Sequence, residues 1–542
     1  MSEQSSLPSR PKEGEPQEAA PSKNALKKLQ KEKEKAEKAA LREQKEREER
    51  EERERVAEAN DTSKHLYGAP PSTFPTPTGN LLATLQQVEA AEESSRVTLV
   101  ATVQSARKQG ATLAFLVLGK YKQTIQAVVT AGGEQGISKP MVKWCQAINT
   151  ESIVRVTAQV RAPAVEIKSD LITLKKYELH VEQIHMIDEA PEQLPIQVKD
   201  CNQPPPEEEE GEESEAKESE KSNINVSLKA RLDNRVLSLR APSTQAILEI
   251  QGAVTLLFQE YMDKHSFTPI QPSYVAGAAT EGGAGVFEIT YFKTKAYLTQ
   301  SPQFFKQMAI AGGLRRFTGL DFEMEIQQHY HEVLSFGEEL IHFIIHALQT
   351  RPKFQELVNI IRKAGYTEAG NFRLPPNGKA VRITFAEAKQ LLKESGYPID
   401  EDPHADIGTS EEKALGEIML KKHNTDFYSV DKYPRSLRPF YTKPCPDNPE
   451  LTNSYDFFMR GQEIMSGAQR INNHQELCAN MSRLGLEPQS EGFIHYTDSF
   501  KYGCMPHGGG GFGLNRIVQY FLGLHNVREA TMFPRDPGRL AP

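Results

Sequence analysis

The chain has 542 residues, which is enough for two or three domains with a large core. Its formal net charge of -8 excludes a protein coated in basic surface, so a nucleic-acid partner would have to meet local positive patches. Five scattered cysteines without CxxC or Cys/His metal spacing are typical of a reducing compartment. No apolar run could span a bilayer and no secretory signal core is present, so we expect a cytoplasmic protein with no membrane partner.

Residues 1–60 are predicted to form a disordered and lysine-rich helical extension. Residues 1–22 are polar and contain prolines, which indicates disorder, whereas nothing between Lys23 and Val56 interrupts a helix. Residues 23–38 hold seven lysines against three glutamates. Two interpretations are open: a solvated single helix, or an RNA-binding arm whose lysines displace counterions from phosphate.

Residues 80–195 are predicted to form a small closed β-barrel of the OB-fold type. From Arg96 onward, apolar residues recur at every second position, for example at Val97, Leu99, Ala101 and Val103. Glycines divide this pattern into short strands. A barrel of this kind offers a face on which single-stranded bases can stack.

Residues 196–224 are predicted to be an acidic linker, because three prolines precede a glutamate-rich run. Residues 225–542 form the largest predicted domain. Its first helix has one apolar stripe, after which an extended segment ends at Pro272; the stripe comprises Ile247, Ile250, Val254, Leu257 and Tyr261. Strand-like runs at 381–385 and 455–465 alternate with helices at 332–348, 385–394 and 410–421, which indicates an α+β body on an antiparallel sheet.

Four successive glycines precede Arg516 near the C-terminus of the chain. Glycine allows a ligand to approach the backbone closely, and an arginine can bind phosphate through two parallel hydrogen bonds. The following helix would anchor the arginine through the apolar stripe Leu514, Ile517, Val518 and Phe521. The run therefore predicts a phosphate site, although most glycine runs taken alone are tight turns or flexible loops.

Glu463 and Ser466 form a candidate metal site, although an isolated glutamate in a strand is seldom a metal ligand. Both offer oxygen ligands, and Mg²⁺ is bound through few protein groups when phosphates complete its shell. Strict alternation along a strand would place the two side chains on opposite faces, so we expect a β-bulge at Ser466–Gly467.

Four separated segments resemble motifs of class II aminoacyl-tRNA synthetases, and together they are similar to the cytosolic aspartyl-tRNA synthetase family. They are Thr280–Phe287, Gln300–Gln307, Gly461–Arg470, and Gly511–Arg516 with Met532–Leu540. The similarity extends from about Ser22 to Pro542. It implies an OB-fold anticodon-binding domain, a class II catalytic domain over residues 225–542, and a homodimer joined around Pro272. The implied reaction is ATP-dependent activation of L-aspartate and its transfer to tRNA(Asp), with Mg²⁺ as the cofactor.

The resemblance also implies residue roles. It gives catalytic roles to Arg516 and Glu463, and metal binding to Glu463 and Ser466. ATP would be bound by Glu463, Gly513, Leu514, Asn515 and Arg516. Aspartate would be bound by Glu281, Gln303, Lys306, Asp321, Ser466 and Arg470. The tRNA would be bound by Lys27, Lys28, Lys31, Phe115, Gln126 and Glu178.

Two of these assignments have alternatives. Lys306 and Arg470 are expected to compensate the side-chain carboxylate of aspartate, which would favour aspartate over asparagine, but they could instead form an ordinary structural ion pair. Phe115 could equally be a core residue of the barrel, because aromatic residues in strands are usually packed.

The chain departs from the family at motif 2. Only the second strand of that hairpin, Phe317–Glu325, is recognisable; the first strand, its arginine and the loop are absent from the sequence. We expect the sheet to lose an inner strand and to expose an edge. A smaller departure is Asn515, where the family usually has an acidic residue. The alternative hypotheses are a catalytically silent paralogue that binds RNA or acts in regulation, and a natural transcript that encodes the missing hairpin.

Overall fold

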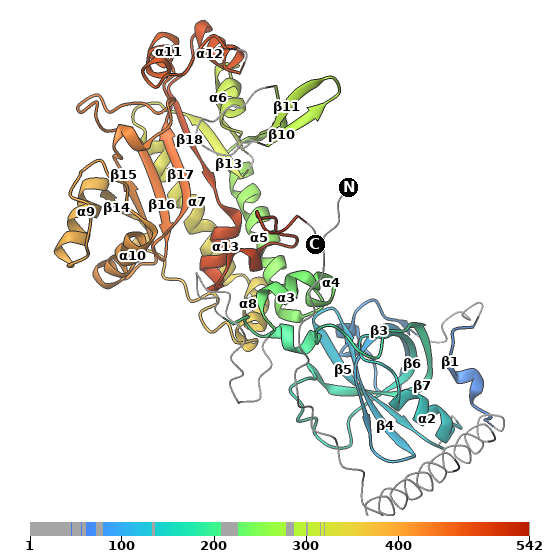
Figure 1. Ribbon diagram of the computed structural model, residues 1–542. Coiled ribbons are helices and arrows are strands. Elements are labelled where there is room, and N and C mark those ends of the chain that lie inside the picture. The colour runs from blue at the N-terminus through green and yellow to red at the C-terminus, as the bar shows by residue number, and fades with distance from the viewer. Residues whose placement is uncertain are drawn as a thin grey trace, which may run out of the picture. The chain divides into compact units, whose positions relative to one another are not determined.

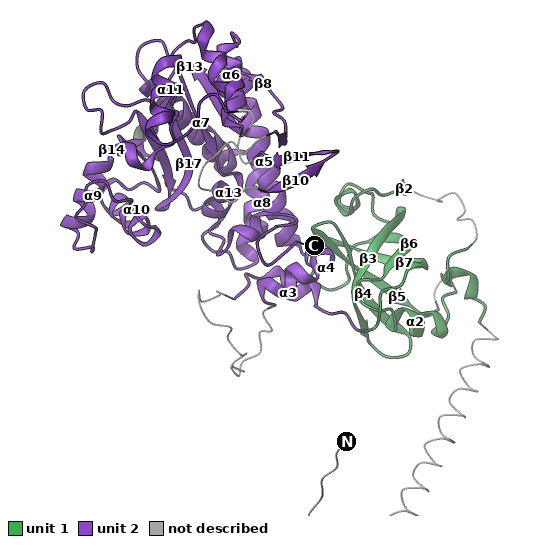
Figure 2. Cartoon of the chain, turned by 45° about the horizontal axis from the view of Figure 1, so that its top comes forward, with its two compact units in different colours: residues 1–192 green, residues 193–542 purple. Residues whose placement is uncertain are grey.

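The structure is a computed structural model that describes residues 61–71, 80–132, 136–206, 226–277, 287–299, 302–314, 316–318, 320–490 and 492–540, with Lys45 and Val56. The chain divides into two compact units, residues 1–192 and 193–542 (Figure 2). Most of the predicted lysine-rich helix and of the acidic linker lies outside the described residues. No helix in the described part of the chain is long and apolar enough to cross a membrane.

The first unit contains a closed five-stranded barrel, which confirms the predicted OB-fold. The barrel closes because β3 pairs with both β4 and β6, and β7 joins β5 to β6. Alternate residues of β3 and β6 fill the interior, among them Val97, Leu99, Val154 and Val156, which are fully buried. The elements are β3 (Arg96–Lys108), β4 (Leu113–Lys120), β5 (Gln123–Thr130), α2 (Lys139–Gln146), β6 (Ile153–Arg161) and β7 (Leu174–Asp188), with short β1 (Tyr67–Gly68) and β2 (Asn80–Leu81) at the edges.

The second unit is built on a mixed, mainly antiparallel sheet of eight strands (Figure 1). This confirms the predicted α+β class. In spatial order the strands are β14 (Val381–Thr384), β15 (Phe427–Asp431), β16 (Ser454–Met459), β17 (Gln462–Gln469), β18 (His507–Phe512), β13 (Asp321–Glu325), β12 (Arg316–Thr318) and β8 (Thr268–Pro269). A separate three-stranded sheet is formed by β9 (Val275–Ala276), β10 (Glu288–Tyr291) and β11 (Thr294–Leu298).

One face of the large sheet packs on the main helical core. The predicted apolar stripe of the first helix is buried there, which follows from its helical spacing. This layer contains α5 (Pro242–Lys264), α7 (His331–Thr350), α8 (Pro352–Lys363) and α13 (Leu514–Leu522). Smaller clusters involve α6 (Gln303–Ala311), α11 (His474–Arg483) and α12 (Ile494–Ser499), or α9 (Phe385–Glu394) and α10 (Thr409–His423). The remaining short helices are α3 (Leu228–Asp233) and α4 (Arg235–Ser238).

The strand-like run predicted at 455–465 is a hairpin rather than one strand. The chain turns between β16 and β17 at Arg460 and Gly461, whose φ angles of 50° and 72° are both positive. Two successive residues with positive φ are characteristic of the tightest hairpin turns, since their twist matches that of the flanking strands. The apolar pattern alone gave no signal for this turn.

The segment predicted to be the second strand of motif 2 also forms two strands, β12 and β13. Residues 316–318 fold back as β12 and pair with β13 on one side and with β8 on the other. The prediction of a single strand over Phe317–Glu325 was therefore wrong, and β13 is an inner strand of the sheet. Backbone hydrogen bonding explains this result, because an unpaired inner strand would leave its N–H and C=O groups without partners.

The four glycines Gly508–Gly511 lie within the inner strand β18, and we call them the glycine strand. The alternative of a turn or flexible loop was wrong. A Cβ on Gly509 would overlap with the carbonyl oxygen of Phe322, and one on Gly510 would overlap with the side chain of Met465. Glycine is required here because neighbouring groups occupy the space that a side chain would fill.

Replacement of Gly509 by alanine is therefore expected to destabilise the protein. Overpacking a well-packed interior costs about 1–3 kcal/mol and sometimes more, and here the obstacle is backbone. Gly252→Ala is the matched control, because no atom lies near the added methyl group and helix α5 would gain up to about 1 kcal/mol. Chemical denaturation measures both; equal unfolding free energies for the two variants would contradict the requirement for glycine.

Candidate active site

The candidate site is built on one face of the sheet, across four neighbouring strands. Asp321 of β13 pairs with Gly511 of β18, Gly511 with Ser466 of β17, and Ser466 with Asp456 of β16. Residues paired directly across strands share a face, so all four positions lie on the face opposite the main helical core. The glycine strand contributes no side chains between two groups of charged side chains, which lie about 10 Å apart given the usual strand spacing.

The first charged group surrounds the buried cations Lys306 and Arg470. Lys306 Nζ donates to Asp321 Oδ1 at 2.9 Å and lies 3.8 Å from Glu323 Oε2. The Arg470 guanidinium donates through Nε to Glu323 Oε1 at 2.8 Å and through Nη2 to Gln303 Oε1 at 3.1 Å. The structure thus brings together four of the residues predicted to bind aspartate.

Glu323 is the acid at the centre of this group, and its side chain is fully buried. Burial by itself would raise the pKa of Glu323, but Arg470 and Lys306 outweigh that effect and hold the pKa below its ordinary value. Burial likewise disfavours a charged Arg470, yet Glu323 keeps the pKa of Arg470 above its ordinary range. Glu323 and Arg470 consequently form a charged pair at neutral pH.

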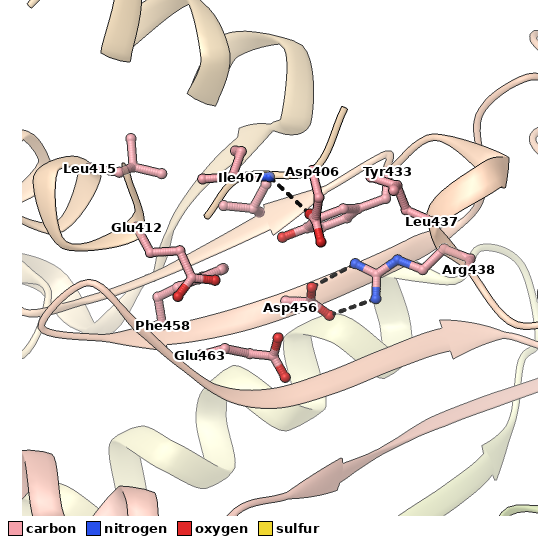
Figure 3. Close-up of a pocket in the computed structure, with 11 residues that line it drawn as sticks. Asp406, Ile407, Glu412, Leu415, Tyr433, Leu437, Arg438, Asp456, Phe458 and Glu463 are labelled. Carbon is pink, nitrogen blue, oxygen red and sulfur yellow. Dashed lines mark hydrogen bonds and ion pairs between the residues drawn. The ribbon is translucent and has the colours of Figure 1, made fainter. Parts of the chain in front are cut away.

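The second charged group lines a cavity of about 200 Å³ on the other side of the glycine strand (Figure 3). Four carboxylates line this acidic pocket together with one arginine, Arg438. Arg438 donates to both oxygens of Asp456, at 3.0 and 2.6 Å, and to Ser466 Oγ at 3.0 Å. The carboxylates are those of Asp406, Glu412, Asp456 and Glu463.

Glu463 and Ser466 do lie on the same face, but the β-bulge that aligns them is not at Ser466–Gly467 as expected. Met465 pairs with Phe457 and Glu463 pairs with Phe458, which leaves Ile464 as the extra residue. Ile464 is anchored at this place because its side chain is buried in the core and its carbonyl accepts from the Gly513 N–H at 2.8 Å. An extra residue between 463 and 466 restores the two-residue period.

Burial and the neighbouring Asp456 raise the pKa of Glu463 to about 7. Burial, followed by the charge of Glu463, raises the pKa of Glu412 to a similar value. The pocket therefore contains more carboxylates than its own arginine can neutralise. No group of three acidic, histidine or cysteine side chains positioned to hold a metal occurs among the residues that the structure describes.

Arg516 lies in the first turn of α13, where its Nη1 donates to the Glu463 carbonyl at 2.7 Å and its side chain remains exposed. Gly513 precedes this helix, and Leu514 is partly buried against the core. Asn515 accepts a hydrogen bond from Gln251 of α5 at 2.7 Å. Asn515 is thus held on the helical side of the sheet.

Three predicted tRNA-binding residues lie on the neighbouring barrel strands β4, β5 and β7, and Glu178 is buried there. Phe115 of β4 and Gln126 of β5 follow the outward alternation of these paired strands, and Gln126 Nε2 donates to Glu178 Oε2 at 2.8 Å. Phe115 is partly exposed and is not a member of the buried core. The core alternative for Phe115 was therefore wrong. Glu281 and the arm residues Lys27, Lys28 and Lys31 lie outside the described residues.

Sequence reasoning missed Glu323, Glu412, Arg438 and Asp456. A signal existed for Glu323, because Asp321, Glu323 and Glu325 alternate with Phe322 and Met324, which predicts an acidic face on this strand. For Asp456, a charged residue within a strongly aromatic run was a weaker signal. Glu412 and Arg438 come from segments distant in sequence, so only the folded chain shows that they meet at this pocket.

The chain matches the family of class II tRNA synthetases (D, K and N) over residues 227–317 and 314–537. The two matched stretches overlap at residues 314–317, next to and within β12. The cytoplasmic aspartate–tRNA ligase of Homo sapiens is 41% identical over 450 residues, covering 79% of this chain and 85% of the relative. The corresponding protein of Caenorhabditis elegans is 39% identical over 450 residues, 79% of this chain and 81% of the relative.

Solved structures show the same relationship. The aspartyl-tRNA synthetase of Entamoeba histolytica has a TM-score of 0.74 at 34% identity, covering 88% of this chain and 96% of the other. A putative aspartyl-tRNA synthetase from Leishmania major Friedlin has a TM-score of 0.76 at 31% identity, covering 89% and 99%. The fold and the family match define a class II aminoacyl-tRNA synthetase. Within that class, the chain belongs to the aspartate–tRNA ligase family.

Removal of the Glu323 charge is expected to destabilise the protein. Glu323→Gln would leave two buried cations facing one carboxylate, and breaking a buried pair costs about 3–5 kcal/mol. The folded-state pKa of Glu323 is depressed, so its contribution is present above the unfolded-state pKa and is lost as pH falls through the folded-state pKa. Urea unfolding should therefore show a weaker acid dependence for the variant.

Glu325→Gln, on the same strand but partly exposed, is the control and should change stability by less than about 1 kcal/mol. Identical pH dependence of the unfolding free energy for Glu323→Gln and the parent would contradict this assignment of charge.

Proposed function

We propose that this protein is an aspartate–tRNA ligase, which activates L-aspartate with ATP and transfers the aspartyl group to tRNA(Asp) in the cytoplasm. The observation that carries the proposal is the pair of buried cations Lys306 and Arg470, set about two strands from an acidic pocket across the glycine strand. The end that contains Lys306 and Arg470 suits a small dicarboxylic amino acid, and the acidic pocket suits a metal–nucleotide. The names of the relatives, which include the word cytoplasmic, support the same assignment.

Selection of aspartate would depend on an exchange of partners around Lys306. Asp321 is the more accessible acid, with 22% of its side chain exposed, whereas Glu323 is fully buried on Arg470. The substrate side-chain carboxylate would take over Lys306, and Asp321 would turn to the substrate ammonium group, assisted by Gln303. Asparagine would leave the buried cation unpaired at a cost of about 1–3 kcal/mol or more. Glu281 would add a further contact to the substrate from the segment Thr280–Phe287.

Activation requires the α-carboxylate of aspartate to attack the α-phosphorus of ATP, so two anions must be brought together. Glu463 and Ser466, with Asp456 opposite, supply oxygen donors on one face, and this donor set fits Mg²⁺. Mg²⁺ bound there would neutralise phosphate charge. Arg516 would bind the phosphate tail, and the backbone at Gly513 and Leu514 would line the nucleotide site with Asn515 behind it.

Recognition of tRNA would be divided between two parts of the chain. The barrel surface that carries Phe115, Gln126 and Glu178 would read the anticodon, through stacking on the aromatic ring and hydrogen bonds to base edges. The N-terminal lysines Lys27, Lys28 and Lys31 would add phosphate contacts that do not depend on sequence. We propose the divisions 1–60, 80–195, 196–224 and 225–542 for the extension, barrel, linker and catalytic domain.

The chain is expected to form aspartyl-adenylate slowly, because the arginine of motif 2 is missing. Loss of one preorganised donor where negative charge develops in the transition state typically costs about 10²–10³ in rate. Aspartate-dependent ATP–pyrophosphate exchange, measured beside the human relative, tests this directly. A rate close to that of the relative would contradict the prediction.

Variants at Arg315 and Arg316, the two arginines that precede Phe317, refine the test. Loss of residual exchange in Arg316→Ala but not in Arg315→Ala would identify the substitute cation. Complete absence of exchange in a chain that still binds tRNA would favour the catalytically silent paralogue. Restoration of exchange by a chain that carries the full hairpin would assign the defect to motif 2.

We also expect a homodimer joined through α5, β8 and the segment around Pro272. Large apolar side chains are exposed close by in sequence, on and beside the sheet β9–β11: Tyr274, Phe287 and Phe292. Exposed apolar groups on this scale are typical of a surface that a second copy covers. Analytical ultracentrifugation at micromolar concentration should give a dimer mass. Pro272→Gly should weaken the dimer and Val165→Asp on the barrel should not; a monomeric parent chain would contradict the proposal.

A further inference from the structure

Lys432 and Cys445 form a close pair of nucleophilic side chains that the proposed function does not use. Lys432 Nζ donates to Cys445 Sγ, and the two atoms lie only 2.7 Å apart. Sulfur is a larger atom than oxygen, yet this distance is at the short limit of N–H···O hydrogen bonds. The amine and the sulfur are therefore closer than a hydrogen bond between them requires, and they lie within reach of a covalent link.

The backbone holds Lys432 in an uncommon conformation. The residue directly follows β15, and its φ of 61° is one that a residue with a side chain seldom adopts. Its N–H donates to the Ser454 carbonyl at 3.0 Å, and its Nζ lies 4.9 Å from the centre of the Tyr330 ring, whose face attracts a cation. Such a conformation persists only where the surrounding structure maintains it, and it is commonest at functional sites.

Cys445 is held equally firmly on the other side of the pair. It lies between Pro444 and Pro446 in the sequence. A proline fixes its own φ and restricts the residue before it, so the backbone around Cys445 has little freedom. The Cys445 N–H also donates to the Leu451 carbonyl at 2.9 Å, and the side chain is buried. The sulfur is therefore kept beside the amine.

Asn453 joins the two side chains and connects them to the end of β17. Its Oδ1 accepts from Lys432 Nζ at 3.1 Å and from Cys445 Sγ at 3.0 Å. Its Nδ2 donates to Gln469 Oε1 at 2.7 Å, which orients the amide. Gln469 is followed by Arg470, so the pair lies one side chain away from the network of buried cations.

Solvent reaches the pair through a second cavity. Lys432 and Cys445 both line this cavity of about 980 Å³, together with residues of α9 and of the segments 397–404 and 447–451. Its lining includes the exposed residues Lys393, Glu401 and Glu450, so the cavity opens to the surface. A small oxidant can therefore reach Cys445 although the side chain itself is buried, and access is one of the conditions for cysteine oxidation.

We infer that Lys432 and Cys445 are a redox modification site, at which a peroxide joins the two side chains covalently through one oxygen atom. The distance between nitrogen and sulfur is too long for a direct bond and suits a bent S–O–N link. Because both groups are already held in place, the reaction needs no search for a partner. The inference goes beyond the proposed function and does not depend on it.

The reaction balances with two molecules of hydrogen peroxide. The first oxidises the Cys445 thiol to a sulfenic acid, which forms an S–O bond and releases water. The second oxidises the Lys432 amine, after its ammonium proton has passed to solvent, to a hydroxylamine, which forms an N–O bond and releases water. The hydroxylamine oxygen then attacks the sulfenic sulfur and displaces water. Sulfur and nitrogen each lose two electrons, and the two peroxides accept all four.

The bridge would connect the end of β15 to the segment that ends beside Asn453. It would close a loop of the chain between residues 432 and 445. Reduction by two molecules of a dithiol supplies the four electrons, restores the thiol and the amine, and releases the bridging oxygen as water. The modification is therefore reversible, unlike oxidation of a cysteine to a sulfinic acid.

The test treats the full-length parent chain with hydrogen peroxide and follows it by mass spectrometry without reductant. Trypsin cleaves after Arg435, so it separates Lys432 from the Cys445 peptide, residues 436–460, unless a bridge joins them. We expect a cross-linked peptide pair whose mass exceeds the sum of the two peptides by one oxygen less two hydrogens. Dithiothreitol should release both peptides unmodified.

Two lysine variants form a matched pair. Lys432→Arg keeps the positive charge but lacks the amine, so the yield of the cross-link should fall at least about tenfold and Cys445 should proceed to the sulfinic acid. Lys443→Arg makes the same change two residues from Cys445, where the amine pairs with Glu476 at 2.6 Å, and it should leave the yield unchanged. Cys445→Ser should abolish the cross-link.

The inference is overturned if the oxidised parent contains Cys445 as a sulfinic acid with no cross-linked pair, or if the pair lacks the added oxygen. A cross-link that persists in Lys432→Arg would contradict it as well. The result for the parent is decisive by itself, so a variant that fails to fold does not remove the test.

Discussion

The candidate site depends on the absence of side chains along the glycine strand. β18 lies between β13, which carries Asp321 and Glu323, and β17, which carries Glu463 and Ser466. Side chains at these glycines would have to lie between the two charged groups. A Cβ at Gly509 would meet the carboxylate of Glu323, and a Cβ at Gly511 would meet the carboxylate of Asp321. The sheet can therefore hold cations at one end and acids at the other only because this inner strand consists of backbone.

The Lys306–Arg470 network and the acidic pocket differ in how their buried charges are balanced. Around Lys306 and Arg470, acids of the protein match the cations one for one, so the network is stable without substrate and can exchange one internal carboxylate for an external one. In the acidic pocket the carboxylates outnumber the lining arginine, and the excess appears as a raised pKa for Glu463. On the proposed function, the first end would take the carboxylate of aspartate and the second a metal ion that arrives with the nucleotide.

Much of the fold could be predicted from local pattern, because period-two strands and the apolar stripe of α5 carry their own signal. Helix α9 was predicted with its observed bounds, and in the structure Thr384 and Glu387 form a capping box at its start. The turn at Arg460–Gly461 and the bulge at Ile464 were not predicted at their positions, because both are set by pairing with residues on neighbouring strands. Arg438 and Glu412 were missed for the same reason: their meeting with Asp456 is a property of tertiary structure.

The folded-back strand β12 shows that pairing within the sheet and the proposed catalysis have different requirements. The three residues of β12 are enough to pair with β13 on one side and with β8 on the other, so β13 has a hydrogen-bonded neighbour there. Backbone pairing is indifferent to side-chain identity, whereas neutralising charge at the α-phosphate requires an arginine held at one place by a longer strand and its loop. The aspartate network, the acidic pocket and the glycine strand are all formed without that arginine. On our proposal the missing arginine would act mainly on the transition state, so an intact sheet would not by itself give full catalytic power.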